Sequence, residues 1–538
     1  MNPQPTRRDF LATSLSATLA LTAPGSLLAL PSETTLADDP RRPQYHLLPA
    51  RNWMNDPNAP IFWKGNYHLF FQYNPHAAVW GDMHWAHAIS PDTVHWRHLP
   101  IALAPTPGGP DAQGCFSGTA IPDGDKVVVL YTGVVTSTSS DATLKDAHNS
   151  FRESQCLAAS ASPDLTVWQK DPTPVLPTPP PGLDITGFRD PSIWRQGGAW
   201  YMAVGSGIRG QGGAILLYRS SDLHHWTYEH ILTYGKMDPH ATPNPVDSGE
   251  MWECPDLFPL GNKHVLIYST RGQSLWQSGT LDSATMLFHP EQHGILDHGS
   301  FYAPKTQRDA HGNRILWGWI PETRPEARYS AAGWAGMMGL PRILSLDSTN
   351  RLRITPSPAL QILRAAPIHP TSSTARSTGP DGTPGPRSRT NAGDQIVVLP
   401  AATGELLLEA HSLTAPFQLT LVLEARDNST QPPIATLTYN PTTGQLTLDN
   451  NTLPLNHPEP SAPANPSNAA PTPRPLTVHL FLDGSVAEIF VNNATALTKR
   501  FYYPGPTAPN IIAHLTTPTG PHTLQAWHLR PISPNRLT

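Results

Sequence analysis

The chain has 538 residues, a formal net charge of −5, and contents of 38% hydrophobic and 14% charged residues, with 61 prolines. This length predicts two or more domains, and a proline share of about twice the usual 5% disfavours long helices, because proline removes a backbone donor and clashes with the preceding turn. The negative charge and the lack of a basic block argue against nucleic acid as a partner.

The first segment is predicted to be an export signal. Thr6-Arg7-Arg8-Asp9-Phe10-Leu11 precedes a weakly apolar run over residues 12–30 that is interrupted by Pro24-Gly25. This pattern is typical of a twin-arginine signal, with a disordered tail as the alternative. The run is too polar for a permanent anchor, and no other stretch could span a bilayer. We expect residues 1–40 to be signal and linker, and the protein to be periplasmic or extracellular.

The three cysteines are Cys115, Cys156 and Cys254. They cannot all pair, and none stands in a metal-binding spacing, so neither a metal nor another cofactor is expected. A protein that is exported after folding in the reducing cytoplasm would need no disulfides, which agrees with the predicted signal.

Two interleaved repeats follow over residues 41–345. A polar turn with glycine precedes a β-branched or aromatic strand five times, at intervals of 51–73 residues that each fit one four-stranded blade. These glycines are Gly65, Gly124, Gly197, Gly261 and Gly312. Between them, an aspartate turn precedes a strand-anchoring tryptophan by four residues, at Trp96, Trp168 and Trp226. The repeats predict a five-bladed β-propeller.

Residues 346–538 continue as alternating strands without the repeat, which predicts a β-sandwich. Two stretches rich in Pro, Ser, Thr and Asn, residues 367–389 and 454–475, are expected to be surface loops. The predicted fold class is therefore all-β, a five-bladed β-propeller followed by a C-terminal β-sandwich.

The glycine repeat also predicts a site. The innermost strand of each blade lines the central channel and ends at the glycine turn, so residues at similar distances before the turns should gather at one mouth. Counting back gives Asp56, Ser117, Asp190, Glu253 and Tyr302. Carboxylates crowded in a concave site repel one another, so one takes up a proton near neutral pH. A proton donor beside an ionised carboxylate is what glycosidic bond cleavage needs.

Two other interpretations of these carboxylates are turn capping and calcium binding. Three carboxylates at similar blade positions argue against turn capping alone. The Asp123-Gly124-Asp125 segment has no following ligand loop and is interpreted as a hairpin turn. The pair His84 and His87 is interpreted as core or turn rather than as a metal site.

Five motifs occur in the order Trp53-Met54-Asn55-Asp56-Pro57-Asn58-Ala59, Phe71-Gln72-Tyr73-Asn74-Pro75, Phe116-Ser117-Gly118, Phe188-Arg189-Asp190-Pro191 and Trp252-Glu253-Cys254-Pro255. In this order they resemble glycoside hydrolase family 32, which includes invertases, inulinases and levanases. Residues 483–490 resemble a strand signature of that family's C-terminal sandwich. Thr119 and Ala86 depart from the usual serine and glycine of the family pattern, and neither change affects the catalytic set.

The resemblance implies a role for each residue. Asp56 matches the nucleophile, Glu253 the general acid/base and Asp190 the transition-state stabiliser, which is paired with Arg189. Cys254 follows the acid/base as in the family, where it would help to keep the pKa of that acid raised. The residues that match positions shaping the fructose pocket are Asn55, Gln72, Trp80, Phe116, Ser117, Tyr302 and Trp319; for Trp80 and Trp319 core packing is the alternative.

The implied activity is retaining hydrolysis of β-fructofuranosyl bonds in sucrose, inulin or levan through a covalent fructosyl-enzyme. A fructosyltransferase would use the same intermediate. A non-catalytic fructan-binding protein would be expected to lack one of the three carboxylates, and all three are present. An inverting arabinan- or xylan-cleaving relative would lack the motif at residues 53–58. Preference among substrates is expected to depend on mouth loops such as residues 136–152 and 237–250.

Overall fold

The computed structural model describes most of the chain and divides it into two compact units. The described residues are 32–138, 141–145, 150–238, 240, 244–372, 394–411, 413, 415–424, 433–441, 443–449, 451–453, 475–516 and 521–537. One unit contains His46–Leu352, and the other contains Asp38–Tyr45 and Arg353–Arg536. The apolar run of the predicted export signal and most of the two predicted surface loops lie outside the described residues.

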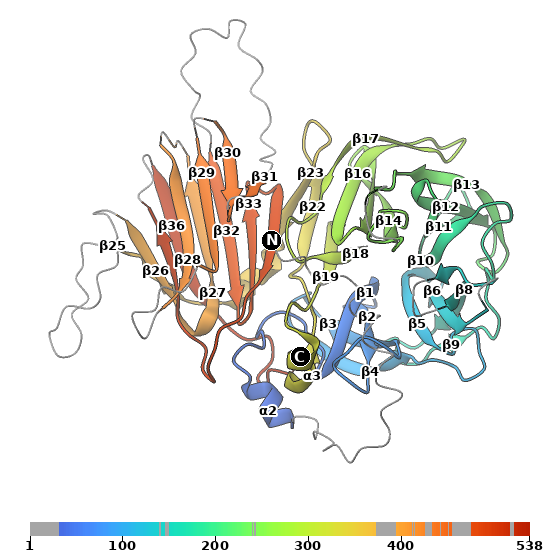
Figure 1. Ribbon diagram of the computed structural model, residues 1–538, viewed down its shortest axis with the longest axis horizontal. Coiled ribbons are helices and arrows are strands. Elements are labelled where there is room, and N and C mark those ends of the chain that lie inside the picture. Colours follow the sequence, from blue (N-terminus) through green and yellow to red (C-terminus); the bar gives the residue numbers. More distant parts are fainter. Residues whose placement is uncertain are drawn as a thin grey trace, which may run out of the picture. The chain divides into compact units, whose positions relative to one another are not determined.

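The first unit contains five sheets that follow one another in sequence (Figure 1). The first has β1 (Asn52–Trp63), β2 (Asn66–Asn74), β3 (His84–Ser90), β4 (Arg97–Leu103) and β20 (Trp334–Ala335). The second has β5 (Gly114–Asp123), β6 (Lys126–Thr136), β7 (Leu144–Lys145), β8 (Ser150–Ser160) and β9 (Gln169–Lys170). The third has β10 (Ile185–Gln196), β11 (Ala199–Ile208), β12 (Gly212–Ser220) and β13 (Trp226–Tyr234).

The fourth sheet has β14 (Glu253–Leu260), β15 (Lys263–Thr270), β16 (Gln273–Leu281) and β17 (Phe288–Ile295). The fifth has β18 (Tyr302–Arg308), β19 (Arg314–Ile320), β21 (Met337–Met338) and β22 (Arg342–Leu346), so it extends past residue 345. Its last strand, β23 (Leu352–Pro356), begins at the final residue of the range His46–Leu352 and otherwise belongs to the second unit. Within the part of the chain that the structure describes, the α-helices are α2 (Glu33–Asp38) and α3 (Glu326–Ala332), both short as the proline content predicts.

The first strands of the five sheets form a ring. β1 contacts β5 and β18, β5 contacts β10, β10 contacts β14, and β14 contacts β18. The short strand β20 also pairs in parallel with β1, with Asn52 opposite Trp334. Because each first strand has a neighbouring first strand on both sides, the sheets close into the predicted five-bladed propeller.

Both sequence repeats correspond to repeated structure. The glycines of the five turns have positive φ values of 56–87°, a backbone conformation that glycine adopts without steric cost, and each turn joins the first strand of a blade to the second. The indole Nε1 atoms of Trp96, Trp168 and Trp226 donate to the main-chain carbonyl three residues earlier, at 3.1, 2.7 and 2.8 Å. Each tryptophan therefore closes the turn that precedes it.

Each first strand is bulged near its beginning. The pairing register shifts at Asn55-Asp56, Ser117, Asp190-Pro191, Cys254-Pro255 and Ala303-Pro304. Asp190, Cys254 and Ala303 have positive φ values of 64°, 52° and 52°, which are strained for residues with a Cβ. A bulge adds one unpaired residue and re-aims the side chains beside it, so the regular alternation is interrupted at a similar place in every blade.

The second unit is a sandwich of two antiparallel sheets (Figure 1). One sheet has the order β24 (Arg364–Ile368), β36 (His522–Leu529), β27 (Thr403–Ala410), β32 (Leu476–Asp483), β33 (Val486–Val491) and β34 (Thr495–Arg500). The other has the order β25 (Thr371–Ser372), β26 (Gln395–Leu399), β35 (Ile511–Leu515), β28 (Phe417–Leu423), β29 (Ala435–Asn440), β30 (Gln445–Leu448) and β31 (Asn451–Leu453). Two 3₁₀ turns, η2 (Pro358–Leu363) and η3 (Pro400–Ala402), complete it.

The core of the sandwich draws alternate residues from both sheets, such as Leu406 and Leu480 from one and Leu419 and Leu437 from the other. This alternation confirms the predicted β-sandwich. The beginning of the first predicted loop differs from the prediction, because residues 364–368 and 371–372 form β24 and β25.

The N-terminal residues Asp38–Tyr45 belong to the sandwich unit. The carboxylate of Asp483 accepts hydrogen bonds from the main-chain N–H groups of Gln44 and Tyr45, at 2.7 and 2.8 Å. The first residue of the predicted sandwich signature therefore anchors the segment that precedes the propeller.

Candidate active site

Asp56 lies at the bulge of β1, where it is only 2% exposed and is surrounded by hydrogen-bond donors. Ser117 Oγ donates to its Oδ2 at 2.6 Å, and Asn55 Nδ2 donates to its Oδ1 at 3.0 Å. Gln72 supports both donors, because its Nε2 donates to Ser117 Oγ and its Oε1 accepts from Asn55 Nδ2, each at 2.7 Å. The orientation of this carboxylate is therefore set by residues from three strands, β1, β2 and β5.

Glu253 begins β14, directly before the bulge residue, and its side chain is fully buried. Arg189 donates to its Oε1 from Nε and Nη2, at 3.1 and 2.9 Å. The hydroxyl of Tyr302 donates to its Oε2 at 2.7 Å. Both carboxylate oxygens therefore have a fixed partner, one a cation and the other a neutral phenol.

Asp190 occupies the bulge of β10 and is held by main-chain contacts. The N–H of Cys254 donates to its Oδ2 at 3.0 Å, and its own N–H donates to Thr132 Oγ1 at 2.9 Å. Thr132 in turn donates to Gln155 Oε1 at 2.9 Å. These bonds support the strained left-handed backbone at Asp190, a feature that tends to occur at functional sites.

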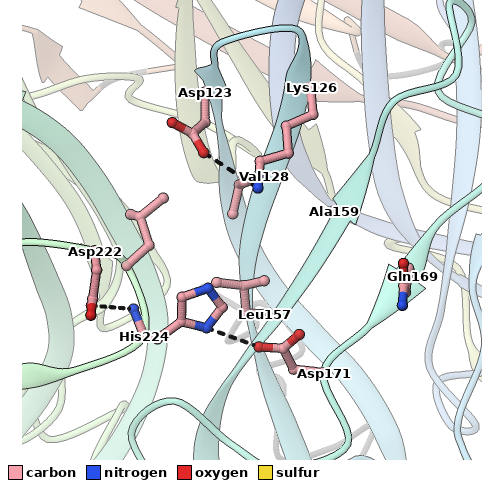
Figure 2. Close-up of a pocket in the computed structure, with 10 residues that line it drawn as sticks. Asp123, Lys126, Val128, Leu157, Ala159, Gln169, Asp171, Asp222 and His224 are labelled. Atoms are coloured by element: carbon pink, nitrogen blue, oxygen red, sulfur yellow. Dashed lines mark hydrogen bonds and ion pairs between the residues drawn. The ribbon is translucent and has the colours of Figure 1, made fainter.

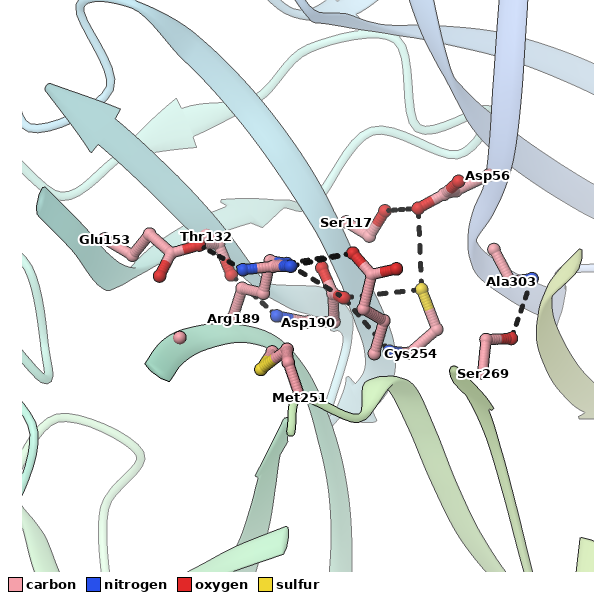
Figure 3. A network of polar contacts seen from close by, with 12 residues as sticks. Asp56, Ser117, Thr132, Glu153, Arg189, Asp190, Met251, Cys254, Ser269 and Ala303 are labelled. Atoms are coloured by element: carbon pink, nitrogen blue, oxygen red, sulfur yellow. Dashed lines mark hydrogen bonds and ion pairs between the residues drawn. The ribbon is translucent and has the colours of Figure 1, made fainter. Parts of the chain in front are cut away.

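The thiol of Cys254 connects two of the carboxylates. Its Sγ lies 3.4 Å from Asp56 Oδ2 and 3.4 Å from Asp190 Oδ2 (Figure 3). Burial, followed by the negative charges of Asp190, Asp56 and Glu253, raises the pKa of this thiol well above its ordinary value. The thiol therefore keeps its proton and can serve both carboxylates as a weak donor.

Aromatic residues line this cluster. Trp80 packs edge-on against Phe116 at a centroid distance of 6.0 Å, and Trp53 packs against Trp319 at 5.9 Å. These four rings belong to one apolar cluster with Cys254, Tyr302 and Tyr329. The structure therefore places every predicted pocket residue near the beginnings of the five first strands, where the bulges lie.

The predicted residues share a position at or directly before the bulge of their strand, rather than an equal distance from the glycine. Asp56, Ser117 and Asp190 stand at the bulges, whereas Glu253 and Tyr302 stand one residue earlier and Cys254 and Ala303 take the bulge positions. With this one-residue offset Glu253 contacts Arg189 and Tyr302, whereas Asp56 contacts Asn55 and Ser117.

Several buried polar residues of the site were missed by the count along the sequence. Glu153 in β8 binds Arg189, and Thr132 in β6 and Gln155 in β8 support Asp190. They lie on the second and third strands of their blade, where no glycine turn marks their distance. In β8 the available signal was a charged residue and an amide, Glu153 and Gln155, directly before the apolar run at residues 156–159.

No group of three or more His, Cys, Asp or Glu residues in the described ranges is arranged to hold a metal ion. The pair His84 and His87 does not form a unit, because His87 Nε2 lies 3.0 Å from Nδ1 of the buried His68 whereas His84 Nδ1 contacts the carbonyl of Asp82. All three cysteines are free and buried. As for membrane spans, none of the described helices is long and apolar enough to cross a bilayer.

A separate polar pocket of about 240 Å³ lies between the second and third blades (Figure 2). It contains the ion pairs Asp123–Lys126 at 3.5 Å and His224–Asp171 at 3.1 Å. None of the predicted site residues lines this pocket, and its lining has no aromatic platform for a sugar ring.

Comparison with known proteins gives two family matches that together cover most of the chain. Residues 46–356 match the Glycosyl hydrolases family 32 N-terminal domain, and residues 383–528 match Glycosyl hydrolases family 32 C terminal.

Individual relatives agree with these matches. A sucrose-6-phosphate hydrolase from Escherichia coli is 40% identical over 339 residues, which are 60% of this chain and 66% of that protein. The chain thus spans slightly less than two thirds of that relative's length. A sucrose-6-phosphate hydrolase from Bacillus subtilis is 31% identical over 89% of this chain and 92% of its own length.

Among solved structures, the chain is similar to a β-fructofuranosidase from Bombyx mori. The two share 29% identity with a TM-score of 0.70, over 93% of this chain and 97% of that one. Similarity in both sequence and structure extends over the propeller and the sandwich together. The chain belongs to glycoside hydrolase family 32.

Proposed function

We propose that this protein is a β-fructofuranosidase that cleaves β-D-fructofuranosyl bonds in sucrose or fructans with retention of configuration. The observation that carries the proposal is the single buried network that joins Asp56, Asp190 and Glu253 from three blades. Similarity to proteins named sucrose-6-phosphate hydrolase, and to the Bombyx mori enzyme solved in complex with sucrose, supports this substrate class.

In the proposed reaction, a carboxylate oxygen of Asp56 forms a bond to the anomeric carbon of the fructosyl unit. Glu253 gives its proton to the departing glycosidic oxygen as that bond breaks. The result is a covalent fructosyl-enzyme. Glu253 then takes a proton from water, whose oxygen displaces Asp56 and releases fructose.

The contacts of the site fit these separate roles. Asp56 has neutral donors on both oxygens, which orient the nucleophile without removing its charge. Asp190 lies beside Arg189, with 3.9 Å between Asp190 Oδ2 and Arg189 Nε, and would hydrogen-bond to fructose hydroxyls as positive charge builds on the sugar. The tyrosine hydroxyl at Glu253 Oε2 is a partner that can donate or accept as Glu253 gains and loses its proton.

Replacing Asp56 by Asn tests the assignment of the nucleophile. The amide keeps the size of the side chain but does not form the fructosyl ester, so turnover of sucrose should fall by at least about 10⁴-fold while sugar binding persists. Isothermal titration with sucrose and a sensitive fructose assay measure the two quantities. Near-normal turnover by Asp56→Asn would show that Asp56 is not the nucleophile.

Hydrolysis is distinguished from transfer by its products. Sucrose, inulin and levan should each be incubated with the enzyme, and the sugars released should be followed over time by chromatography. A hydrolase yields free fructose, whereas a fructosyltransferase on concentrated sucrose yields growing oligomers. Binding without any product would indicate a fructan-binding protein.

We also propose that the protein is exported through its twin-arginine segment. The sequence pattern at Arg7-Arg8 and the absence of any disulfide among three free, buried cysteines support export after folding. Replacing both arginines by lysine should retain the protein in the cytoplasm, as measured by fractionation and immunoblotting. Unchanged export of this variant would contradict the proposal.

A further inference from the structure

We propose that Glu153 is a positioning residue for the proton donor: it holds Arg189 in place and offsets its charge so that Glu253 can retain a proton. The inference rests on the proposed function, in which Glu253 is the general acid/base. It concerns a residue outside the sequence motifs, on the third strand of the second blade.

The guanidinium of Arg189 is shared between two glutamates. Its Nε and Nη2 donate to Glu253. On the other edge, its Nη1 donates to Glu153 Oε1 at 2.8 Å (Figure 3). All three side chains are at most 3% exposed. Because a guanidinium is planar and its donors have a fixed fork geometry, a partner at one edge fixes the orientation of the other edge.

Glu153 is itself rigidly held. Its Oε2 accepts from Thr143 Oγ1 at 2.9 Å and from the main-chain N–H of Phe188 at 2.7 Å. Thr143 Oγ1 also accepts from the main-chain N–H of Glu153 at 2.9 Å. Two residues outside the carboxylate cluster thus fix the glutamate that in turn fixes Arg189.

The charge balance explains why a second glutamate is useful. A cation that donates two hydrogen bonds to Glu253 favours the ionised form of that carboxyl and opposes its role as a proton donor. Burial by itself would lower the pKa of Arg189, but the charges of Glu153, Glu253 and Asp190 raise it well above its ordinary value, so the guanidinium stays charged. Glu153 supplies a negative charge on the far edge of the guanidinium and reduces the field of the cation at Glu253.

Glu153 is distinguished by its position from the other charged or titratable groups around Glu253. Arg189 from β10 and Tyr302 from β18 bind Glu253 directly. Asp190 from β10, Asp56 from β1 and Lys305 from β18 act electrostatically on Cys254, the next residue of its own strand. Lys305 Nζ donates to the carbonyl of Pro255 at 2.9 Å. Glu153 acts through Arg189, so its substitution can change the charge at Glu253 without removing a group of the substrate pocket.

The test is the pH profile of Glu153→Gln on sucrose. Loss of the negative charge leaves Glu253 with a stronger cationic neighbour, so Glu253 should lose its proton at lower pH. The alkaline limb of kcat/KM should therefore shift by about one pH unit toward lower pH, with a fall in kcat and little change in KM. An alkaline limb in its parent position, or one shifted to higher pH, would overturn the proposal.

Glu405→Gln is the matched control. Glu405 is a buried glutamate in the sandwich unit that accepts from Arg364 Nε and Nη2 at 2.8 and 2.6 Å. The substitution removes the same charge from beside an arginine that is 22% exposed, and it should cost stability without moving the pH profile. A matching shift in this control would mean that the shift reports general destabilisation, and would overturn the proposal.

Thr143→Val gives a second, milder test should Glu153→Gln fail to fold. It removes one donor from Glu153 while the charge of Glu153 remains. The alkaline limb of kcat/KM should therefore move to higher pH, or move by less than about half a pH unit. The kcat should fall about threefold, because Arg189 is held less firmly. Parental kcat in Thr143→Val would count against positioning. Failure of the proposed function is distinguishable, because the parent enzyme itself would then release no fructose.

Discussion

The inner strands of the propeller and the strands of the sandwich use β-structure in opposite ways. In β28, β29 and β35, buried and less buried residues alternate, and pairs such as β27 with β32 keep one register throughout. In β1, β10 and β14 nearly every residue before the turn is buried, polar ones included, and the register breaks at a bulge. Regular pairing stabilises the sandwich, whereas irregular pairing places the buried carboxylates of the propeller.

After the loss of turnover expected for Asp56→Asn, the largest expected effect comes from removing the proposed proton donor. Glu253→Gln should lower kcat on sucrose by about 10²–10⁴-fold, because the amide has no proton to give to the leaving oxygen. The melting temperature should change little, since Arg189 keeps its bond to Glu153. Steady-state kinetics and calorimetry measure these two effects. Strong destabilisation with only a modest loss of kcat would show that the bulged region has a structural role instead.

The converse experiment removes a core residue of the sandwich. Leu480 in β32 is fully buried, so Leu480→Ala should lower the free energy of unfolding by about 2–5 kcal/mol through lost burial and a cavity. Turnover per folded molecule should be unchanged. Val398→Ala, at a 38% exposed position of β26, is the control and should cost well under 1 kcal/mol. A urea titration measures the stability of each variant, and steady-state kinetics measure its turnover. A lower turnover per folded molecule in Leu480→Ala would contradict this expectation.

A glycine contact sharpens the comparison within the propeller. A Cβ on Gly213 of β12 would lie 2.0 Å from Cδ1 of Trp252, which stacks on Tyr268 and directly precedes Glu253. Gly213→Ala should therefore displace Trp252, cost about 1–3 kcal/mol of stability and lower kcat/KM about tenfold. The exposed Arg219 of the same strand, replaced by Ala, should leave both values near those of the parent. If Gly213→Ala has the same kcat/KM as the parent, the alignment of Glu253 does not depend on Trp252.

The last prediction concerns the pH dependence of stability and the buried histidines of the first blade. Burial lowers the pKa of His68 to about 4, from an ordinary value of 6.5. The unfolded chain therefore binds a proton that the folded chain does not, and stability should fall as the pH drops from 6.5 toward 4, by up to about 1.4 kcal/mol per pH unit. His68→Asn should flatten the dependence of the melting temperature on pH, whereas substitution of the exposed His311 should not. An unaltered slope in His68→Asn would place the acid sensitivity elsewhere.

Much of the architecture was predictable because it repeats. Glycine at the five turns and tryptophan at Trp96, Trp168 and Trp226 have local physical causes, a positive φ and an indole hydrogen bond, that each copy must satisfy. The strands of the sandwich were predictable from alternation alone. By contrast, the sequence did not predict β24 and β25, at residues 364–368 and 371–372. These strands are short, and their proline, serine and threonine residues are typical of loops.

The site was predictable only as far as it follows the repeat. Asp56, Asp190 and Glu253 were found by their distance from the glycines, but the one-residue offset of Glu253 depends on where each bulge falls. Glu153 was not predictable in this way, because its contact with Arg189 joins the third strand of one blade to the first strand of the next. Such contacts depend on how neighbouring sheets twist and pack, which no single strand encodes.

The pairing of β1 with β20 has a consequence for how the molecule is made. Asp56 lies on β1, which is synthesised before the other blades, whereas β20, which completes the sheet around it, follows three further blades and the first two strands of the fifth. Contacts between such distant segments form slowly, and an unclosed ring leaves strand edges open to other chains. A nascent chain that stops before residue 334 would therefore hold Asp56 in an unfinished sheet, so assembly of the ring is a late step in folding.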